Sequence, residues 1–348
     1  MKSARTEKVV TTALALLFSF LVCGLFLVVL GYNPLAVYGI VLTGSLGRSY
    51  SILKSLTKAT PLIFTGLSVY FADQGGLFNI GAEGQLQIGG VTAGILGYEL
   101  SLVGFPPLLS IVICLVAGFG LAGCWGVVPG WLKARFGANE FIVSMMLNYV
   151  ASFLCEYLVT YPFRGPGVTA KTNQIPASYQ LPRLVKGSQF NISFFIGILA
   201  VLLVFLFFRF TSSGYEIRTM GKNKFAAQIA GINTKKQTVF VFFIAGGLAG
   251  LAGVTEVLGI HGFYINDLSP GYGFDGIAVS VLAQGTPFGV FLSSLLFGAL
   301  RAGGSRLDLK SKVPSEFITI LQAVVIVFIA TPKIIQKFGL WREKNKNV

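Results

Sequence analysis

Long apolar runs separated by short polar stretches dominate this chain. The hydrocarbon core of a bilayer is about 30 Å thick, and a helix of about 20 apolar residues crosses it. Six runs have roughly that length, and they cover residues 9–31, 107–130, 139–160, 191–210, 237–257 and 315–331. Each of these runs predicts a helix that spans a membrane.

Four further apolar segments are short or are interrupted by glycine and polar residues. They cover residues 59–72, 84–100, 274–284 and 287–300. Backbone that leaves a helix at membrane depth is buried in protein or lines a wet cavity, because lipid offers no hydrogen bonds. The pattern as a whole predicts an all-α integral membrane protein of about ten transmembrane helices, some of them short or interrupted.

The composition agrees with a chain that lies mostly in a membrane. Of its 348 residues, 54% are hydrophobic and 11% are charged, whereas soluble domains carry about 25% charged residues. No polar block between the runs is long enough to fold separately. We therefore expect residues 1–348 to form a single transmembrane domain.

The distribution of positive charge predicts how the chain is oriented. With about ten spans, both termini lie on one side of the membrane, and that side carries 16 of the 27 Lys and Arg residues. Basic residues favour the cytoplasmic side, so we expect cytoplasmic termini, a cytoplasmic loop at 209–236 and an external loop at 161–190. The net charge of +14 is spread between the spans, which indicates contact with anionic lipid and not with nucleic acid.

The residues that usually carry catalysis or bind metals are sparse. The four cysteines lie in apolar runs without paired spacing, and the one histidine, His261, is expected in a solvated external loop with no ligand partners nearby. The motifs HExxH and GxSxG are absent, as is the phosphate-binding motif GxxxxGK[ST]. We expect no enzyme activity and no bound cofactor, so any ATP hydrolysis has to come from another polypeptide.

Polar residues within the interrupted segments have two possible roles. They can line a path for a solute, or they can cap helices and form hydrogen bonds between helices. Two stretches, FADQGGLFNIGAEGQ and GYGFDGIAVSVLAQG, occupy comparable places in the two halves of the chain, as in transporters built from repeats. The candidate pathway residues are Asn79, Glu83, Gln85, Asn148, Asp275 and Gln284.

The loop at 209–236 contains a short segment with its own helix signals, residues 222–231. Asn223 is placed to cap a helix and Gly231 to end it. The apolar positions between them share one face, which suits docking to a partner, contact with the lipid surface or a simple connection. The members are Lys222, Asn223, Lys224, Phe225, Ala226, Ala227, Gln228, Ala230 and Gly231.

Four ordered blocks resemble one family of membrane proteins. They are GLSVYFADQGGLFNIGAEGQLQIGG at 66–90, GANEFIVSMMLNYV at 137–150, GYEIRTMGKNKFAAQIAGIN at 214–233 and GYGFDGIAVSVLAQG at 271–285. They resemble permease subunits of bacterial ABC importers for simple sugars and nucleosides, in the branched-chain amino acid and ribose permease superfamily. The likeness is greatest to the nucleoside branch, and the most specific element is FNIGAEGQ at 78–85.

The resemblance implies a transporter assembled from several chains in the bacterial cytoplasmic membrane. The expected partners are an ABC ATP-binding subunit that uses ATP, a second permease subunit, identical or homologous, and an extracytoplasmic substrate-binding protein. Residues 222–231 would then be the helix that couples the permease to the ATPase. The expected cargo is a purine nucleoside, with riboflavin or a simple sugar as alternatives, moved by alternating access.

A different class of transporter also uses broken helices around a central site. An ion-coupled secondary transporter of a small polar solute would work without an ATPase partner. The two hypotheses differ in whether an ATP-binding subunit copurifies with the chain.

Overall fold

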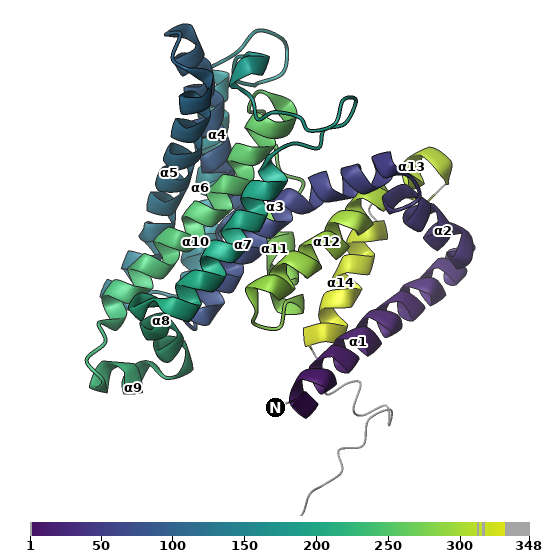
Figure 1. Cartoon of the computed structure of the whole chain (residues 1–348), viewed down its shortest axis with the longest axis horizontal. Helices are drawn as coiled ribbons and strands as arrows, with labels where there is room; N and C mark the ends of the chain where they lie inside the picture. Colours follow the sequence, from purple (N-terminus) through teal and green to yellow (C-terminus); the bar gives the residue numbers. More distant parts are fainter. Residues whose placement is uncertain (1, 312, 315–316, 331–348) are drawn as a thin grey trace, which may run out of the picture. The chain divides into compact units, whose positions relative to one another are not determined.

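The computed structural model describes residues 2–311, 313–314 and 317–330, and helices make up most of them (Figure 1). The α-helices are α1 (Lys2–Val29), α2 (Pro34–Ser45), α3 (Ser49–Gln74), α4 (Ala82–Leu102), α5 (Pro107–Phe136), α6 (Glu140–Thr160), α7 (Ser193–Phe210), α8 (Ser212–Lys222), α9 (Lys224–Ile229), α10 (Thr234–Glu256), α11 (Tyr272–Leu282), α12 (Pro287–Gly304), α13 (Leu307–Lys310) and α14 (Phe317–Ala330). A 3₁₀ turn, η1 (Ala177–Tyr179), and a π-helix, η2 (Val257–His261), complete the set.

The helices confirm an all-α membrane protein. Within the described residues, five helices are long and apolar enough to cross a bilayer, and they are α5, α6, α7, α10 with η2, and α12. Shorter apolar helices occur at Leu17–Val29, Pro34–Ser45 and Tyr272–Leu282. The count of ten spans and the cytoplasmic termini stay predictions, since Lys312 and the basic residues beyond 330 lie outside the described residues.

One interrupted segment is longer than the hydropathy pattern predicted. The apolar run 59–72 belongs to α3, a continuous helix of 26 residues that contains Pro61. Its polar first half is helical as well, and hydroxyl groups there return hydrogen bonds to the helix backbone, as when Ser55 Oγ donates to the Ser51 carbonyl at 3.1 Å. In contrast, α11 has 11 residues and is as short as predicted.

The chain divides into two compact units, whose boundaries fall inside α3 and α12. One unit consists of the described parts of 1–55 and 299–348, and the other consists of 56–298. In the first unit α1 packs on α14, where Ser19 Oγ donates to the Val324 carbonyl at 3.5 Å and the rings of Phe18 and Phe328 stack. The prediction of a single transmembrane domain is not tested by this division.

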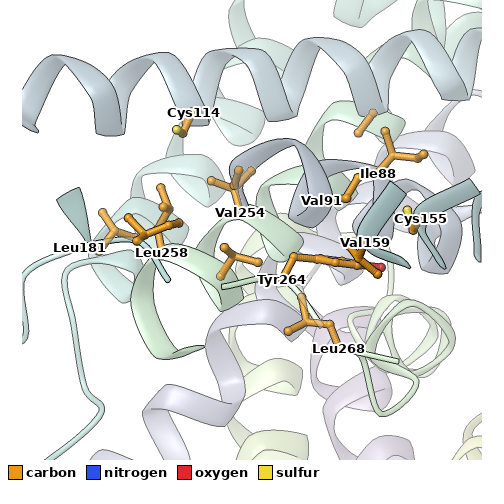
Figure 2. Close-up of a cluster of buried hydrophobic side chains, with 14 of the residues drawn as sticks. Ile88, Val91, Cys114, Cys155, Val159, Leu181, Val254, Leu258, Tyr264 and Leu268 are labelled. Atoms are coloured by element: carbon orange, nitrogen blue, oxygen red, sulfur yellow. The ribbon is translucent and has the colours of Figure 1, made fainter. Parts of the chain in front are cut away.

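In the second unit, α10 packs along α5 and α4 (Figure 1). Small residues allow this close approach, because a Cβ atom on Gly253 would overlap the Leu86 carbonyl of α4. Around the contact, buried side chains from α4, α6 and α10 form a core with Tyr264 and Leu268 (Figure 2).

Backbone hydrogen bonds join the loop 161–190, which the charge pattern predicts to be external, to the π-helix η2 and the residues after it. Thr172 N donates to the Tyr264 carbonyl at 2.9 Å, and Leu181 N donates to the Leu258 carbonyl at 2.8 Å. Since Leu258 lies within the π-helix, the loop covers a part of α10 where the normal helical ladder has been widened. The loop is therefore an ordered cap on this end of the unit.

Candidate functional site

Asn79, in the loop between α3 and α4, and Gln85, in the first turns of α4, have side-chain amides that bind each other. Asn79 Nδ2 donates to Gln85 Oε1 at 2.7 Å, and Gln85 Nε2 donates to Asn79 Oδ1 at 3.1 Å. Asn79 Nδ2 also donates to Ser68 Oγ at 3.0 Å. Both amide side chains are buried, so two of the candidate pathway residues close this loop onto the start of α4.

Asn148 reaches the same place from α6. Its Oδ1 atom accepts a hydrogen bond from Gly84 N at 2.9 Å, and its Nδ2 atom donates to the Ile80 carbonyl at 3.0 Å. The residue before α4 is Gly81, which has no side chain with which to cap the helix. Asn148 therefore satisfies a first-turn N–H of α4 from a neighbouring helix. A role on the solute path stays a prediction for Asn148, Asn79 and Gln85.

Glu83 joins the two interrupted segments to each other. This buried carboxylate lies in the first turn of α4, and its Oε2 atom accepts a hydrogen bond from Gly273 N, at the start of α11, at 2.7 Å. The N-terminus of a helix attracts negative charge. A side chain on Gly273 would overlap the backbone of Glu83, so glycine allows the two helix starts to meet.

The remaining candidates lie at opposite ends of α11. Asp275 is half-buried in its first turn, whereas Gln284 follows its last residue with a positive φ of 50°. Helical rise places the two about 14 Å apart. The structure thus places Asn79, Gln85 and Asn148 together at the start of α4. It links Glu83 to the start of α11. Gln284 lies at the other end of α11.

The segment predicted as a helix over 222–231 is helical over a shorter range. Helix α9 covers Lys224–Ile229, while Lys222 ends α8. The predicted cap is confirmed, since Asn223 Oδ1 accepts a hydrogen bond from Ala226 N at 3.0 Å. The predicted end is also confirmed, since Gly231 has a φ of +82°.

Helix α9 presents apolar side chains to the exterior. Phe225 is 77% exposed and Ile229 is 90% exposed. The small side chain of Ala227, in contrast, is buried within the chain. An exposed apolar surface of this kind on a short loop helix suits contact with another protein.

The end of α8 touches the loop that carries Asn79. A Cβ atom on Gly76 would lie 3.0 Å from the backbone of Gly221, and a Cβ atom on Gly221 would overlap the Gln74 carbonyl. Gly76 also has a φ of +65°, which favours glycine. Backbone at Gly76, two residues before FNIGAEGQ, is therefore in direct contact with backbone at Gly221, three residues before α9.

The sequence interpretation missed several buried polar residues. Glu256 ends α10 in a buried position, and its Oε2 atom is 3.6 Å from Nε2 of His261, which ends the π-helix and is not in a free loop. Gln87 Oε1 and Asn266 Oδ1 are buried without a hydrogen-bond partner, an arrangement that costs about 1–3 kcal/mol per group. A signal was available for Glu256, the one acidic residue in the run 237–257.

Residues 51–330 match the family described as branched-chain amino acid transport system, permease component. The chain is 32% identical to the guanosine ABC transporter permease protein NupP of Bacillus subtilis, over 98% of each chain. It is also 32% identical to the nucleoside ABC transporter permease protein NupB of Lactococcus lactis, over 95% of this chain and 93% of that one.

A glucose ABC transporter permease protein of Haloferax volcanii is 32% identical as well, over 94% of this chain and 88% of the relative. Among solved structures, an inward-facing ABC transporter of metal-chelate type covers 96% of this chain and is 15% identical, with a TM-score of 0.44. The sequence relatives therefore span almost the whole chain.

Proposed function

Because this chain belongs to the family of branched-chain amino acid transport system permease components, we propose that it is the membrane-spanning subunit of an ATP-driven importer for a nucleoside or a nucleoside-like solute. It moves this solute by alternating access between an outward-open and an inward-open state. The chain itself performs no covalent chemistry, and ATP is hydrolysed on a partner subunit.

The observation that carries the coupling mechanism is the contact between Gly221 and Gly76. An ATP-binding subunit seated on the exposed face of α9 would push or pull the end of α8, which lies against the loop that contains Asn79. Binding of ATP favours the closed ATPase dimer, and this difference in affinity supplies the bias between the two states of the permease.

The choice of a nucleoside rests on relatives whose names state guanosine and nucleosides and which align over nearly their full length. A sugar is the second candidate, since the glucose permease is equally similar. A nucleoside and a sugar share a ring that carries several hydroxyl groups. We therefore propose hydroxyl recognition as the common requirement.

The complete importer, in this proposal, lies in the bacterial cytoplasmic membrane. It contains this chain, a second permease subunit, a pair of ATP-binding subunits that contact α9, and an extracytoplasmic substrate-binding protein that delivers the solute to the external side. The relatives supporting this assembly are themselves named as permease proteins of ABC transporters.

The test is uptake by membrane vesicles that contain this chain with its copurifying partners, offered labelled inosine, riboflavin and ribose in competition. We expect uptake of one solute, inosine first, that requires both ATP and the binding protein. Uptake driven by an ion gradient alone, with no ATP-binding subunit present, would contradict the proposal and establish a secondary transporter.

A further inference from the structure

The first turns of α6 lie against residues 78–85, which include the end of the loop before α4. The rings of Phe78 and Phe141 stack, with their centroids 4.7 Å apart and 3° between their planes. One turn further along α6, a Cβ atom on Gly81 would lie 3.2 Å from Ser144 Cβ. Stacked aromatic rings attract each other beyond the area that they bury, so the start of α6 is held directly on this stretch.

The next turns of α6 contact the same stretch. Asn148 accepts the hydrogen bond from Gly84 N at 2.9 Å, and a Cβ atom on Gly84 would lie 3.0 Å from Ala151 Cβ. The contacting residues of α6 are three, four and three positions apart, which is the spacing of one helical face. They are Phe141, Ser144, Asn148 and Ala151. One side of α6 is therefore fitted to residues 78–84 over about 15 Å.

The same face continues to the other end of α6. Cys155 and Val159 follow Ala151 at intervals of four residues, and both are buried in the core that contains Tyr264 (Figure 2). Tyr264 is bonded in turn to the loop 161–190. Thr172 N donates to the Tyr264 carbonyl and Tyr264 N donates to Thr172 Oγ1, each at 2.9 Å. Because this loop also begins directly after α6, the helix is joined to it both along the chain and through Tyr264.

The rest of the described chain holds α6 only weakly. An ion pair between Lys133 and Glu140 joins its first turn to the last turns of α5, and its main packing partner is α4. Among the five long apolar helices, α6 has the smallest share of residues buried within the chain, 28% of its most apolar stretch. A rigid helix that is packed mainly on one element follows that element when it is displaced. The residues that α6 leaves exposed include Ile142, Met146, Tyr149 and Phe153.

The length of α6 allows it to connect the two ends of the permease. Its 21 residues extend about 31 Å, which is close to the thickness of the hydrocarbon core, about 30 Å. At one end it lies on the stretch that follows Gly76, the residue in contact with Gly221 near α9. At the other end it leads into the loop 161–190. Alternating access requires the two ends of a transporter to respond to each other.

We propose that α6 transmits the displacement of α9 to the loop 161–190 by moving as one body with residues 78–84, and that the stacked rings of Phe78 and Phe141 begin this transmission. The inference rests on the proposed function and deepens it, because it names the helix that links the ATP-dependent contact to the opposite end of the permease. Phe141 is in this sense a positioning residue. It sets the place of α6 and touches no solute.

The experiment measures the response of the loop 161–190 in the complete importer, reconstituted in vesicles. A fluorophore is attached to Val168→Cys, at a position that is 99% exposed, in a Cys124→Ala background. We expect its emission to change when ATP and vanadate trap the ATP-binding subunits in their closed state. In Phe141→Ala, which removes the stacked ring, this change is expected to be lost although ATP is still bound. Phe141→Tyr, which keeps a ring that can stack, is expected to restore it.

Phe153→Ala is the matched control, because it removes an equal ring from the opposite side of α6, where Phe153 is 69% exposed. The fluorophore should respond as in the wild type. A cross-link gives a second test, which does not require Phe141→Ala to assemble. Phe78→Cys and Phe141→Cys are combined and joined by oxidation. We expect uptake per ATP hydrolysed to stay unchanged for the labelled solute that the wild type transports, inosine, riboflavin or ribose, because the two positions remain together throughout the cycle.

A full response of the fluorophore in Phe141→Ala overturns the inference, even where less importer is recovered, because the ring would then have only a structural effect. Uptake that stops when the cross-link forms and returns on reduction also overturns it, since α6 would have to part from residues 78–84 during transport. If the wild type shows no uptake that requires ATP, the proposed function itself fails. Uptake by the wild type without any response at Val168→Cys overturns the inference alone.

Discussion

The hydrogen-bonded amides of Asn79 and Gln85 allow the contribution of a single side chain to the free energy of unfolding to be tested. Replacing Asn79 with Leu keeps the volume but leaves the Gln85 amide and the N–H of Gly81 without their partner. We expect Asn79→Leu to lower the free energy of unfolding by about 1–3 kcal/mol. Thermal unfolding of the purified, detergent-solubilised importer measures the change.

The control for this prediction is a double-mutant cycle with Gln85→Met. Because the two side chains bind each other, the double variant is expected to lose clearly less stability than the sum of the two single variants. Additive losses would mean that the amides act independently and would contradict the pairing.

At the scale of residues, the sequence was sufficient where the partner is close along the chain. The cap at Asn223 and the helix end at Gly231 depend on backbone groups within about one turn, and both were predicted. The hydrogen bonds that Gly84 N donates to Asn148 and Gly273 N donates to Glu83 join residues 64 and 190 positions apart. No local pattern encodes such distances, so the sequence left capping as one of two roles for Asn148, and its partner Gly84 became visible only in the structure.

At the scale of elements, α9 carries the contact expected with the ATP-binding subunit. We predict that Phe225→Asp and Ile229→Asp each reduce the amount of ATP-binding subunit that copurifies by at least about tenfold, since each places a charge in an apolar contact. Quantitative pull-down of the tagged permease measures this loss. Val168→Asp introduces the same charge at a residue of the loop 161–190 that is 99% exposed, and it should leave copurification intact. Equal recovery from all three variants would rule out docking at α9.

The contact between Gly221 of α8 and Gly76, in the loop after α3, leads to a separate prediction. A methyl group at Gly221 would overlap the Gln74 carbonyl, so Gly221→Ala displaces the backbone through which α9 reaches the loop. We expect Gly221→Ala to keep its ATP-binding subunit and hydrolyse ATP but to lose most solute uptake, about tenfold or more. The ratio of solute transported to ATP consumed reports this uncoupling.

Gly120→Ala is the control for that experiment, because a Cβ atom on Gly120 meets no other atom within 4 Å. It should transport with the wild-type ratio. If Gly221→Ala does so too, the backbone contact does not transmit the motion.

Elements were predicted from hydropathy, and hydropathy measures lipid contact rather than helix formation. It found the cores of α5, α6, α7 and α10. The hydropathy pattern predicted too short a range for α3, because the first residues of this helix are polar. It also predicted no separate helix for α8, which is amphipathic and mixes polar with apolar residues. It gave no signal for the π-helix after α10, where Leu181 N of the loop 161–190 donates to the Leu258 carbonyl.

At the scale of the whole molecule, orientation in the membrane is open to direct measurement. The positive-inside pattern predicts that α9 is cytoplasmic and that the loop 161–190 is external. Cys23, Cys114 and Cys155 are buried, whereas Cys124 is exposed. The experiment therefore uses a Cys124→Ala variant, in which no exposed native cysteine competes for the label. We expect a membrane-impermeant maleimide to label Val168→Cys in right-side-out vesicles and Ile229→Cys only in inside-out vesicles. The reverse labelling pattern would mean that the topology is inverted and that α9 lies on the side of the membrane opposite the ATP-binding subunit.

The packing of α1 on α14 has a consequence for biosynthesis. Ser19 and Val324 lie 305 positions apart, so at 5–20 residues per second a ribosome needs roughly 15–60 s between them. During that interval α1 has been translated while its partner helix has not, whereas residues 56–298 leave the ribosome as one uninterrupted stretch. A chain truncated before Phe317 therefore carries a first helix that lacks the partner on which it packs.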